Sequence, residues 1–178
     1  MKKVIVHSSA IGQALPNDVP QLIDVGLAAY GEYADIIGEE HWALMRQNLS
    51  DEAKIVHLLA QSTCFVARYN GKIIAMAFML PSGNPVDVYE ANWSSIRFVA
   101  VHPLHKGKQL AKNLTQMCIN EAINSGEQTI ALHTSSMMPA AMHIYESFGF
   151  KKIRDLGLRF GQPYFLYTLD LSAKTLAP

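Results

Sequence analysis

The chain has 178 residues, of which 49% are apolar, and its 15 basic residues are balanced by 15 acidic ones. This length and apolar content predict one domain over residues 1–178 with a substantial hydrophobic core. The zero net charge argues against a general nucleic-acid-binding or membrane-surface protein, because both classes usually carry a strong basic bias.

Neither a membrane anchor nor a disulfide scaffold is expected. No apolar run approaches the roughly 18 residues that span a bilayer, and the run after the two N-terminal lysines is too short for a signal-peptide core. Cys64 and Cys118 lie in apolar patterns that predict buried thiols. Two cysteines cannot staple a chain of this size, and they are compatible with a reducing compartment. We therefore expect a soluble, cytoplasmic protein.

The N-terminal third is predicted to contain one short strand followed by helices. The β-branched run Val4–His7 predicts the strand. Asn17–Asp18 ahead of a proline is a helix-start signal, and the apolar periodicity that follows predicts a helix ending near Gly31. A second helix is predicted over Glu39–Asn48. A third begins with Ser50 as its N-cap and has acidic residues in its first turn.

The middle of the chain predicts a hairpin and then a long loop. The apolar runs Thr63–Tyr69 and Lys72–Leu80 flank Asn70–Gly71, which is the strongest short-range hairpin signal. The loop Pro81–Asn92 contains two prolines and lies next to the following strand. Long loops in compact domains are often functional, so this loop is a candidate part of a site.

Strands and helices then alternate. A strand over Ser95–Val101 is followed by an amphipathic helix over Gln109–Ser125, with Gly126 as its stop. A second strand is predicted over Gln128–His133. A second helix runs from Pro139 to Gly149.

Two further strands are predicted to close the chain as an antiparallel pair. They cover Lys151–Phe160 and Tyr164–Leu171, around a turn at Gly161–Gln162–Pro163. The complete order predicts an α/β (α+β) fold. We expect a mixed, mostly antiparallel central sheet with helices on both faces and one parallel pair joined by the 109–125 helix.

The junction between the 95–101 strand and the 109–125 helix has the parts of an anion site. Backbone N–H groups at a helix N-terminus lack partners within the helix, and the helix dipole there favours an anion. Lys106 and Lys108 add positive charge, and Gly107 allows the backbone to approach a ligand closely. Taken alone, this loop is better interpreted as a strand-to-helix turn with two solvated lysines, because short glycine motifs have a high false-positive rate.

Other chemistry is less well supported. His102 and His105 could share a metal only with further ligands, and no cysteine or carboxylate cluster is adjacent in the sequence, so no metal site is expected. The chain has no Gly-x-Ser-x-Gly elbow, and Cys118 is predicted on a buried helix face. A hydrolase nucleophile is therefore unsupported.

Two segments together resemble the GNAT acetyltransferase superfamily, and the element order is similar to it over nearly the whole chain. The family signature is Gln or Arg, two residues, Gly, one residue, then Gly or Ala, just after the fourth strand. Here Lys106–Ala111 reads Lys-Gly-Lys-Gln-Leu-Ala, so Lys106 replaces the usual Gln or Arg and Gln109 replaces the central Gly. The later segment Ile144–Phe150 closely matches Leu-Tyr-Glu-x-x-Gly-Phe, while Met138 stands where the family often has Asn.

The resemblance implies a place for acetyl-CoA as co-substrate. In the family, coenzyme A lies where two parallel strands splay apart. Val99 and Val101 would then offer backbone groups to its pantetheine arm and thioester. The phosphates would be bound by the segment made up of Lys106, Gly107, Lys108, Gln109, Leu110 and Ala111.

The resemblance also implies how the reaction proceeds. Tyr145 would donate a proton to the leaving thiolate, since a phenol with a pKa of about 10 stays protonated at neutral pH. The Val99 N–H is the family's candidate donor to the developing oxyanion. The base that deprotonates the amine is not identified by the sequence, and Glu90, Asp87 and His133 remain open, directly or through water.

The implied activity is direct transfer of an acetyl group to a primary amine, without an acyl-enzyme. The acceptor would bind among the N-terminal helices, the 81–92 loop and the C-terminal hairpin, and could be a small molecule or a peptide amine. The aromatic content of these parts leans toward a small molecule. A non-catalytic acyl-CoA sensor remains the alternative. The oligomeric state is not readable, although exposed hairpins in such folds often pair, which leaves a homodimer open.

Overall fold

The computed structural model describes residues 9–84 and 88–173. These residues form a seven-stranded sheet in the order β1-β2-β3-β4-β5-β7-β6. The strands are β1 (Ala10–Gln13), β2 (Thr63–Tyr69), β3 (Lys72–Leu80), β4 (Ser94–Val101), β5 (Thr129–Ser135), β6 (Lys151–Arg159) and β7 (Gln162–Asp170). All neighbouring strands are antiparallel except β4 and β5. The predicted mixed, mostly antiparallel sheet with one parallel pair is therefore confirmed.

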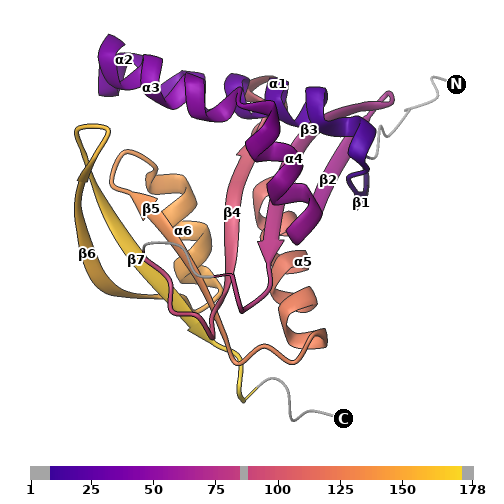
Figure 1. Cartoon of the computed structure of the whole chain (residues 1–178), viewed down its shortest axis with the longest axis vertical. Coiled ribbons are helices and arrows are strands. Elements are labelled where there is room, and N and C mark those ends of the chain that lie inside the picture. Colours follow the sequence, from indigo (N-terminus) through magenta and orange to yellow (C-terminus); the bar gives the residue numbers. More distant parts are fainter. Residues whose placement is uncertain (1–8, 85–87, 174–178) are drawn as a thin grey trace, which may run out of the picture.

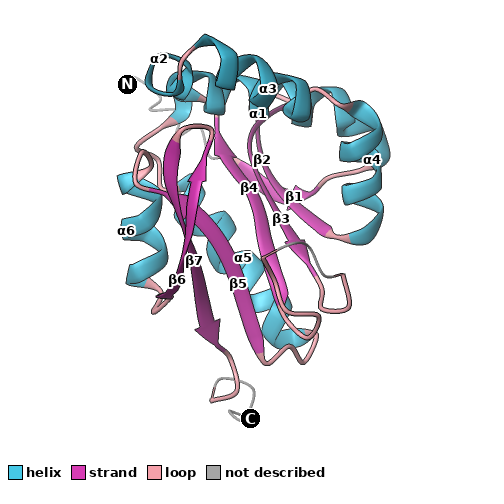
Figure 2. Cartoon of the chain, turned by 60° about the vertical axis from the view of Figure 1, so that its left-hand side comes forward, coloured by secondary structure: helices cyan, strands magenta, loops and turns pink. Residues whose placement is uncertain are grey.

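Helices cover both faces of the sheet, as predicted (Figure 2). One face carries α1 (Val19–Tyr30), α3 (Glu39–Leu49) and α4 (Glu52–Gln61), with the single turn α2 (Ala34–Ile37) beside them. The other face carries α5 (Leu110–Asn124) and α6 (Pro139–Ser147). No helix in the described part of the chain is long and apolar enough to cross a membrane.

Alternating side chains of the strands divide the core between these two faces. In β2, Phe65 and Ala67 pack toward α5, whereas Cys64 and Val66 pack toward α1. The predicted apolar stripe of α5 is buried through Leu110, Leu114, Cys118 and Ala122. Both cysteines are free and buried, and burial raises the pKa of both thiols. Neither thiol is therefore suited to act as a nucleophile.

The parallel pair separates soon after it begins. The register joins β4 to β5 only at Ser94↔Ile130 and Ser95↔Ala131. Beyond that point the two strands diverge, and Figure 1 shows the β5–β7–β6 part of the sheet leaning away from the β4–β3–β2 part. The gap between the strands opens on the side where α1 crosses the sheet.

A bulge in β4 lies beside this opening. Phe78 pairs with Arg97 and Met76 with Ala100, so Phe98 and Val99 together oppose a single residue of β3. Phe98 has a positive φ of 49°, which a residue with a side chain rarely adopts. A bulge bends its strand and increases the local twist. The sequence predicts the β4 strand but not this bend.

Several element ends differ from the sequence predictions. The first helix ends at Tyr30, next to the predicted stop at Gly31, but Gly31 begins a 3₁₀ turn at φ −58° that leads into α2, so the helical backbone is not yet broken there. The break comes at Gly38, which has φ 81°. Ser50 does not cap α4; the N-cap is Asp51, whose carboxylate accepts from the Lys54 N–H. Ser50 instead follows α3 and donates its hydroxyl to the Arg46 carbonyl.

The edges of the sheet also differ from expectation. The predicted strand Val4–His7 lies outside the described residues, and β1 at Ala10–Gln13 was not predicted. The closing hairpin turns at Phe160–Gly161, with φ values of 51° and 70°, so Gln162 and Pro163 already belong to β7. Positive φ at both positions is typical of a two-residue hairpin turn. The turn therefore begins about one residue earlier than the sequence predicts.

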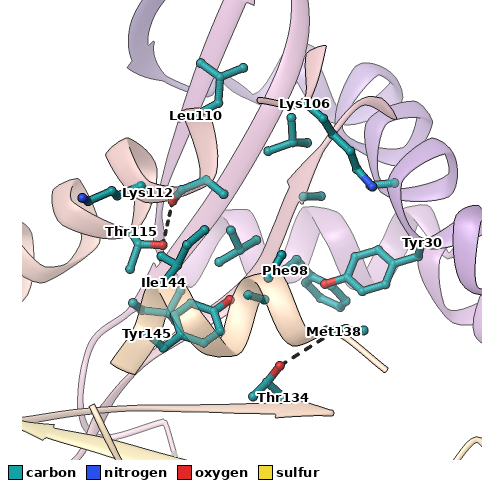
Figure 3. Close-up of a pocket in the computed structure, with 18 of the residues that line it drawn as sticks. Tyr30, Phe98, Lys106, Leu110, Lys112, Thr115, Thr134, Met138, Ile144 and Tyr145 are labelled. Carbon is teal, nitrogen blue, oxygen red and sulfur yellow. Dashed lines mark hydrogen bonds between the residues drawn. The ribbon is translucent and has the colours of Figure 1, made fainter. Parts of the chain in front are cut away.

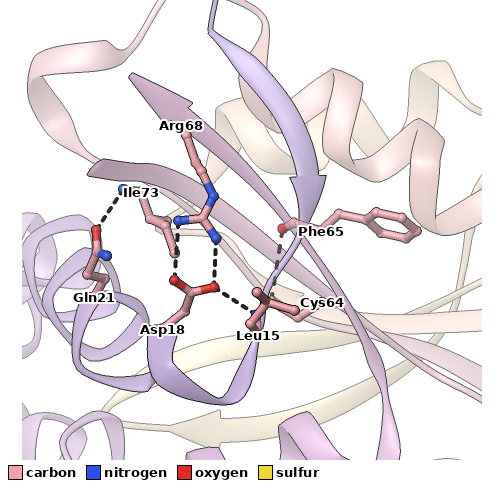
Figure 4. Close-up of polar contacts among 7 residues, drawn as sticks. All are labelled: Leu15, Asp18, Gln21, Cys64, Phe65, Arg68 and Ile73. Carbon is pink, nitrogen blue, oxygen red and sulfur yellow. Dashed lines mark hydrogen bonds and ion pairs between the residues drawn. The ribbon is translucent and has the colours of Figure 1, made fainter. Parts of the chain in front are cut away.

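One polar cluster attaches the start of α1 to the sheet (Figure 4). The Arg68 guanidinium on β2 donates to both Asp18 carboxylate oxygens, at 3.2 and 2.6 Å. Asp18 also accepts from the Leu15 N–H at 2.7 Å, and Gln21 accepts from the Ile73 N–H at 3.0 Å. These bonds fix α1, whose far end reaches the gap between β4 and β5.

Candidate active site

A cavity of about 460 Å³ fills the gap between β4 and β5, and we call it the gap cavity. Its lining includes residues of β4, of β5, of the loop after β4, and of the helices α1, α5 and α6. The side chains labelled in Figure 3 include Tyr30, Phe98, Lys106, Leu110, Thr115, Met138, Ile144 and Tyr145. Of the residues predicted to bind the coenzyme or to donate the proton, all except Lys108 line this cavity.

The β4 edge of the gap cavity is a strand edge without a neighbour. Val99 and Val101 lie beyond the last residues that pair with β5. Their backbone N–H and C=O groups on that side therefore have no β5 partner within the described sheet. An extended ligand could add to such an edge as an extra strand, with main-chain hydrogen bonds supplying affinity.

The loop after β4 presents the N-terminus of α5. Gln109 is the N-cap and adopts a left-handed conformation at φ 58° and ψ 17°, and Gly107 has φ 77°. The first i−4 bond of the helix runs from the Asn113 N–H to the Gln109 carbonyl, at 2.9 Å. The preceding N–H groups therefore have no acceptor within the helix and can bind an anion. The Lys106 N–H differs, because it donates to the Pro103 carbonyl at 3.4 Å.

The two lysines of this loop are held by neighbours. Lys106 forms an ion pair and hydrogen bond with Glu32, which follows α1. Lys108 lies 5.7 Å from the centre of the Tyr69 ring, and its Nζ is 3.4 Å from His105 Nδ1. Positive charge is thus kept close to the helix N-terminus at two points of the loop.

Tyr145 is buried in α6 at 7% exposure and lines the gap cavity. Its ring packs edge-on against Phe150, with centroids 6.0 Å apart. Its hydroxyl points into the cavity, and the Tyr30 hydroxyl points in from α1 on the other side (Figure 3). Burial is the main cause that raises the pKa of both phenols above the ordinary value. Both therefore remain neutral proton donors at physiological pH.

A second cavity, of about 830 Å³, lies on the side of β4 that faces α3, α4 and the β6–β7 hairpin. It shares Tyr30, Ile96, Phe98, His133 and Met138 with the gap cavity, so these residues mark the junction between the two. The rest of its lining includes Met45, Leu49, Leu58, Leu80, Tyr89, Arg97, Arg159, Phe160 and Tyr164. The regions predicted to form an acceptor site thus meet around one cavity.

Of the three candidate bases, only His133 lines either cavity within the described residues. Tyr89 Oη is 2.5 Å from His133 Nδ1, and the centroids of the Tyr164 and His133 rings are 6.0 Å apart. These contacts orient the His133 ring at the junction. Glu90 is exposed and lines neither cavity, and Asp87 lies outside the described residues.

Two of the residues that differ from the family pattern, Met138 and Gln109, each lie at the start of a helix. Met138 is the N-cap of α6 and lines both cavities, and the Thr134 hydroxyl approaches its sulfur at 4.0 Å. Gln109 occupies the left-handed position at the α5 N-cap, which is where a glycine would be least strained. Within residues 9–84 and 88–173, no group of three or more His, Cys, Asp or Glu side chains could hold a metal ion.

A family model described as "Acetyltransferase (GNAT) family" matches residues 30–150. The chain belongs to this acetyltransferase family. The matched region contains β4, the loop, α5 and Tyr145, so it includes the whole gap cavity apart from Ala29.

Two curated relatives match parts of the chain. The chain is 29% identical over 109 residues to human N-acetyltransferase 8B, covering 61% of this chain and 47% of the relative. It is 33% identical over 67 residues to the Escherichia coli L-amino acid N-acyltransferase MnaT, covering 36% of this chain and 39% of that protein. The chain thus spans about half or less of the length of these two relatives.

Solved structures share the fold at low identity. The PaiA N-acetyltransferase of Thermoplasma acidophilum, in complex with coenzyme A, matches with a TM-score of 0.74 and 16% identity over 92% of this chain and 99% of its own. An N-acetyltransferase of Staphylococcus aureus matches with a TM-score of 0.71 and 21% identity over 93% and 99% of the two chains. These matches confirm the predicted fold class.

Three features of the site were not identified from the sequence as functional. They are the left-handed bulge at Phe98, the Tyr30 hydroxyl and the basic side chain of Arg97 on β4. The bulge has no sequence signal in a single chain. Arg97 has a sequence signal, because it is the sole charged residue of β4 and interrupts the apolar run that starts at Ile96.

Proposed function

We propose that the protein is an acetyl-CoA-dependent N-acetyltransferase that transfers an acetyl group directly to a primary amine. One observation carries the proposal. The gap cavity extends from the N-terminus of α5 to the hydroxyl of Tyr145, along a β4 edge that has no strand beside it. One continuous cavity therefore contains a helix N-terminus that can bind an anion, a strand edge without a β5 partner and a buried phenol.

The chain's own groups fit the coenzyme. Backbone groups of Val99 and Val101 would hydrogen bond the pantetheine arm in the manner of an added strand. N–H groups from Gly107 to Ala111, with the charges of Lys106 and Lys108, would bind the phosphates. When bound, acetyl-CoA supplies the activated acetyl group, and the residues around it orient that group toward the junction of the two cavities.

Tyr145 would act as the general acid. As the amine nitrogen bonds to the acetyl carbon, the carbon–sulfur bond breaks and the Tyr145 hydroxyl donates its proton to the leaving sulfur. Burial keeps the Tyr145 pKa above its ordinary value, so the donor is protonated over the whole physiological range. Positioned proton donors of this kind contribute about 10²- to 10⁴-fold to a rate.

His133 would accept the proton of the attacking amine. The tautomer suited to this role carries its proton on Nδ1 and donates it to Tyr89 Oη, so that the Nε2 lone pair receives the amine proton. The acceptor would reach His133 through the second cavity, which has room for a small molecule.

A non-catalytic acyl-CoA sensor is the second candidate, and Gln109 is the observation that favours it. A side chain at the left-handed position of the phosphate loop departs from the family signature. The retained Tyr145 hydroxyl in the cavity argues against this candidate, because a sensor has no need of a proton donor there.

One assay distinguishes the transferase from the sensor. Purified protein is titrated with acetyl-CoA by calorimetry, and free thiol is then followed over a panel of primary amines, including amino acids, polyamines and a peptide N-terminus. An enzyme releases thiol at a rate that depends on one class of amine. Tight coenzyme binding without amine-dependent thiol release would support the sensor instead.

A further inference from the structure

The second cavity has a charge that is unusual for a site that receives an amine. Its described lining includes Lys54, Arg97 and Arg159, together with His57 and His133, and includes no Asp or Glu side chain. A free amine is mostly an ammonium cation at neutral pH. Like charges raise the cost of bringing such a cation into a partly desolvated cavity. The lining is therefore unsuited to an acceptor whose only charge is its amine.

Arg97 is the cation closest in the chain to the proposed reaction centre. It lies two residues before Val99 on β4, and the bulged Phe98 stands between them. Arg97 is half-buried, and its guanidinium lies 5.6 Å from the centre of the Tyr89 ring, which in turn contacts His133. It takes part in none of the ion pairs formed by the described residues.

The other two basic side chains have different surroundings. Lys54 is 62% exposed in its side chain and interacts with Asp51 and Asn48, at 3.4 and 3.1 Å. Arg159 is on the β6–β7 hairpin close to Tyr164. Burial raises the pKa of Tyr164, and the positive charge of Arg159 partly offsets that rise. A guanidinium held over an aromatic ring is a fixed fork of donors that suits a carboxylate.

Most of the remaining surface of the second cavity is apolar. Leu58, Leu80, Phe98 and Phe160 contribute side chains to it, and Tyr164 adds a further ring. A ligand that pairs with Arg97 and fills this space therefore combines an anion with an apolar body. The amine must lie within a few ångströms of the anion if it is to reach the junction beside Val99 and His133.

We propose that the acceptor is a free α-amino acid with a large apolar or aromatic side chain, and that Arg97 binds its carboxylate. The inference rests on the proposed function, because it names the acceptor of the same site. The carboxylate on Arg97 places the α-amino nitrogen toward His133, and the side chain occupies the apolar part of the second cavity.

Matched pairs of acceptors test the inference. L-phenylalanine, L-leucine and L-methionine are each compared with the amine that lacks the carboxylate: phenethylamine, isopentylamine and 3-(methylthio)propylamine. L-phenylalaninamide stands for a peptide N-terminus. For at least one pair, kcat/KM of the wild type should favour the amino acid by about 10- to 100-fold over the amine that lacks the carboxylate, the range expected for a charge-assisted hydrogen bond. If L-phenylalanine is that amino acid, it should be favoured over L-phenylalaninamide in the same range.

Variants then assign the preference to Arg97. Arg97→Gln should reduce the preference at least about tenfold, mainly through the KM of the amino acid, and Arg97→Lys should give an intermediate ratio. Arg46→Gln is the matched control, because Arg46 is exposed on α3 and lines neither cavity. Equal rates with amino acids and their decarboxylated analogues, or an unchanged ratio in Arg97→Gln, would overturn the inference.

A binding measurement separates this inference from the proposed function. N-acetyl-L-phenylalanine keeps the carboxylate but has no reactive amine, and its binding is followed by calorimetry in wild type and Arg97→Gln. Binding that depends on Arg97, without thiol release from any amine, would retain the carboxylate site and reject the transferase. Thiol release with no carboxylate preference would retain the transferase and reject the carboxylate site.

Discussion

Replacing Gln109 with glycine tests how the phosphate loop is built. Gln109 adopts the left-handed conformation at φ 58°, is exposed, and makes no side-chain capping bond. An L-residue in this conformation is strained by about 1–2 kcal/mol. Glycine removes that strain but gives the unfolded chain more freedom, which costs about 0.4–1 kcal/mol. The net expectation is a stabilisation of about 0.5–1 kcal/mol, or a rise in Tm of about 1–4 °C for a chain of this size.

Thermal unfolding of Gln109→Gly and Gln109→Ala measures this effect. Alanine keeps the Cβ atom and therefore the strain, so its Tm should stay close to that of the wild type. Equal shifts in the two variants, or a lower Tm for Gln109→Gly, would refute the account of a strained N-cap.

The same two variants address coenzyme binding. The loop backbone already has the conformation that a glycine would adopt, and the Gln109 side chain is exposed. We therefore expect the Kd for coenzyme A to change by no more than about threefold in either variant. Much tighter binding in both would mean that the glutamine side chain obstructs the phosphates.

Three further perturbations follow from the described contacts. Asp18→Asn should destabilise the protein by about 1–3 kcal/mol at pH 7, whereas the exposed control Asp24→Asn should not. The Arg68 hydrogen bonds lower the Asp18 pKa. This stabilisation is therefore complete well above the ordinary carboxyl pKa of about 3.9 and is lost as the pH falls through the lowered pKa. Denaturant melts of the wild type and the variant should accordingly converge in acid. Glu32→Gln releases Lys106 from a surface ion pair, and calorimetry should show coenzyme binding tightened by at most about fivefold; weaker binding would argue against a phosphate role for this lysine. His133→Gln should lower kcat/KM by about 100-fold or more near neutral pH, and the deficit should shrink as pH approaches the pKa of the amine; a deficit independent of pH would assign His133 a structural role.

The sequence predicts the elements of the site better than their arrangement. Asn70–Gly71, Gly126 and the apolar stripe of α5 are local signals, and each element that they define is present in the structure. The family segments around Gly107 and Tyr145 locate the gap cavity, because both lie on its lining. These predictions depend on residues whose effect is local to the chain.

Features that depend on distant neighbours were not predicted. The pairing of Lys106 with Glu32 joins residues far apart in the chain, and the bulge at Phe98 follows from its register with β3. The sequence also fails to distinguish Ser50 from the adjacent Asp51 as the cap of α4, since both residue types favour that position. α1 ends beside Gly31 as predicted, but the 3₁₀ turn that continues from Gly31 into α2 was not, because a glycine near a helix end permits either course.

The central claim is that the Tyr145 hydroxyl donates a proton to the departing thiolate, and Tyr145→Phe tests it most directly. The phenylalanine ring keeps the packing against Phe150 and removes only the hydroxyl. Amine-dependent thiol release and coenzyme binding are measured in parallel for both proteins between pH 6 and about pH 9, where the wild-type Tyr145 remains protonated because burial raises its pKa. We predict that kcat falls by about 100-fold or more while the coenzyme Kd is nearly unchanged. A Tyr145→Phe variant that turns over at the wild-type rate would contradict the account.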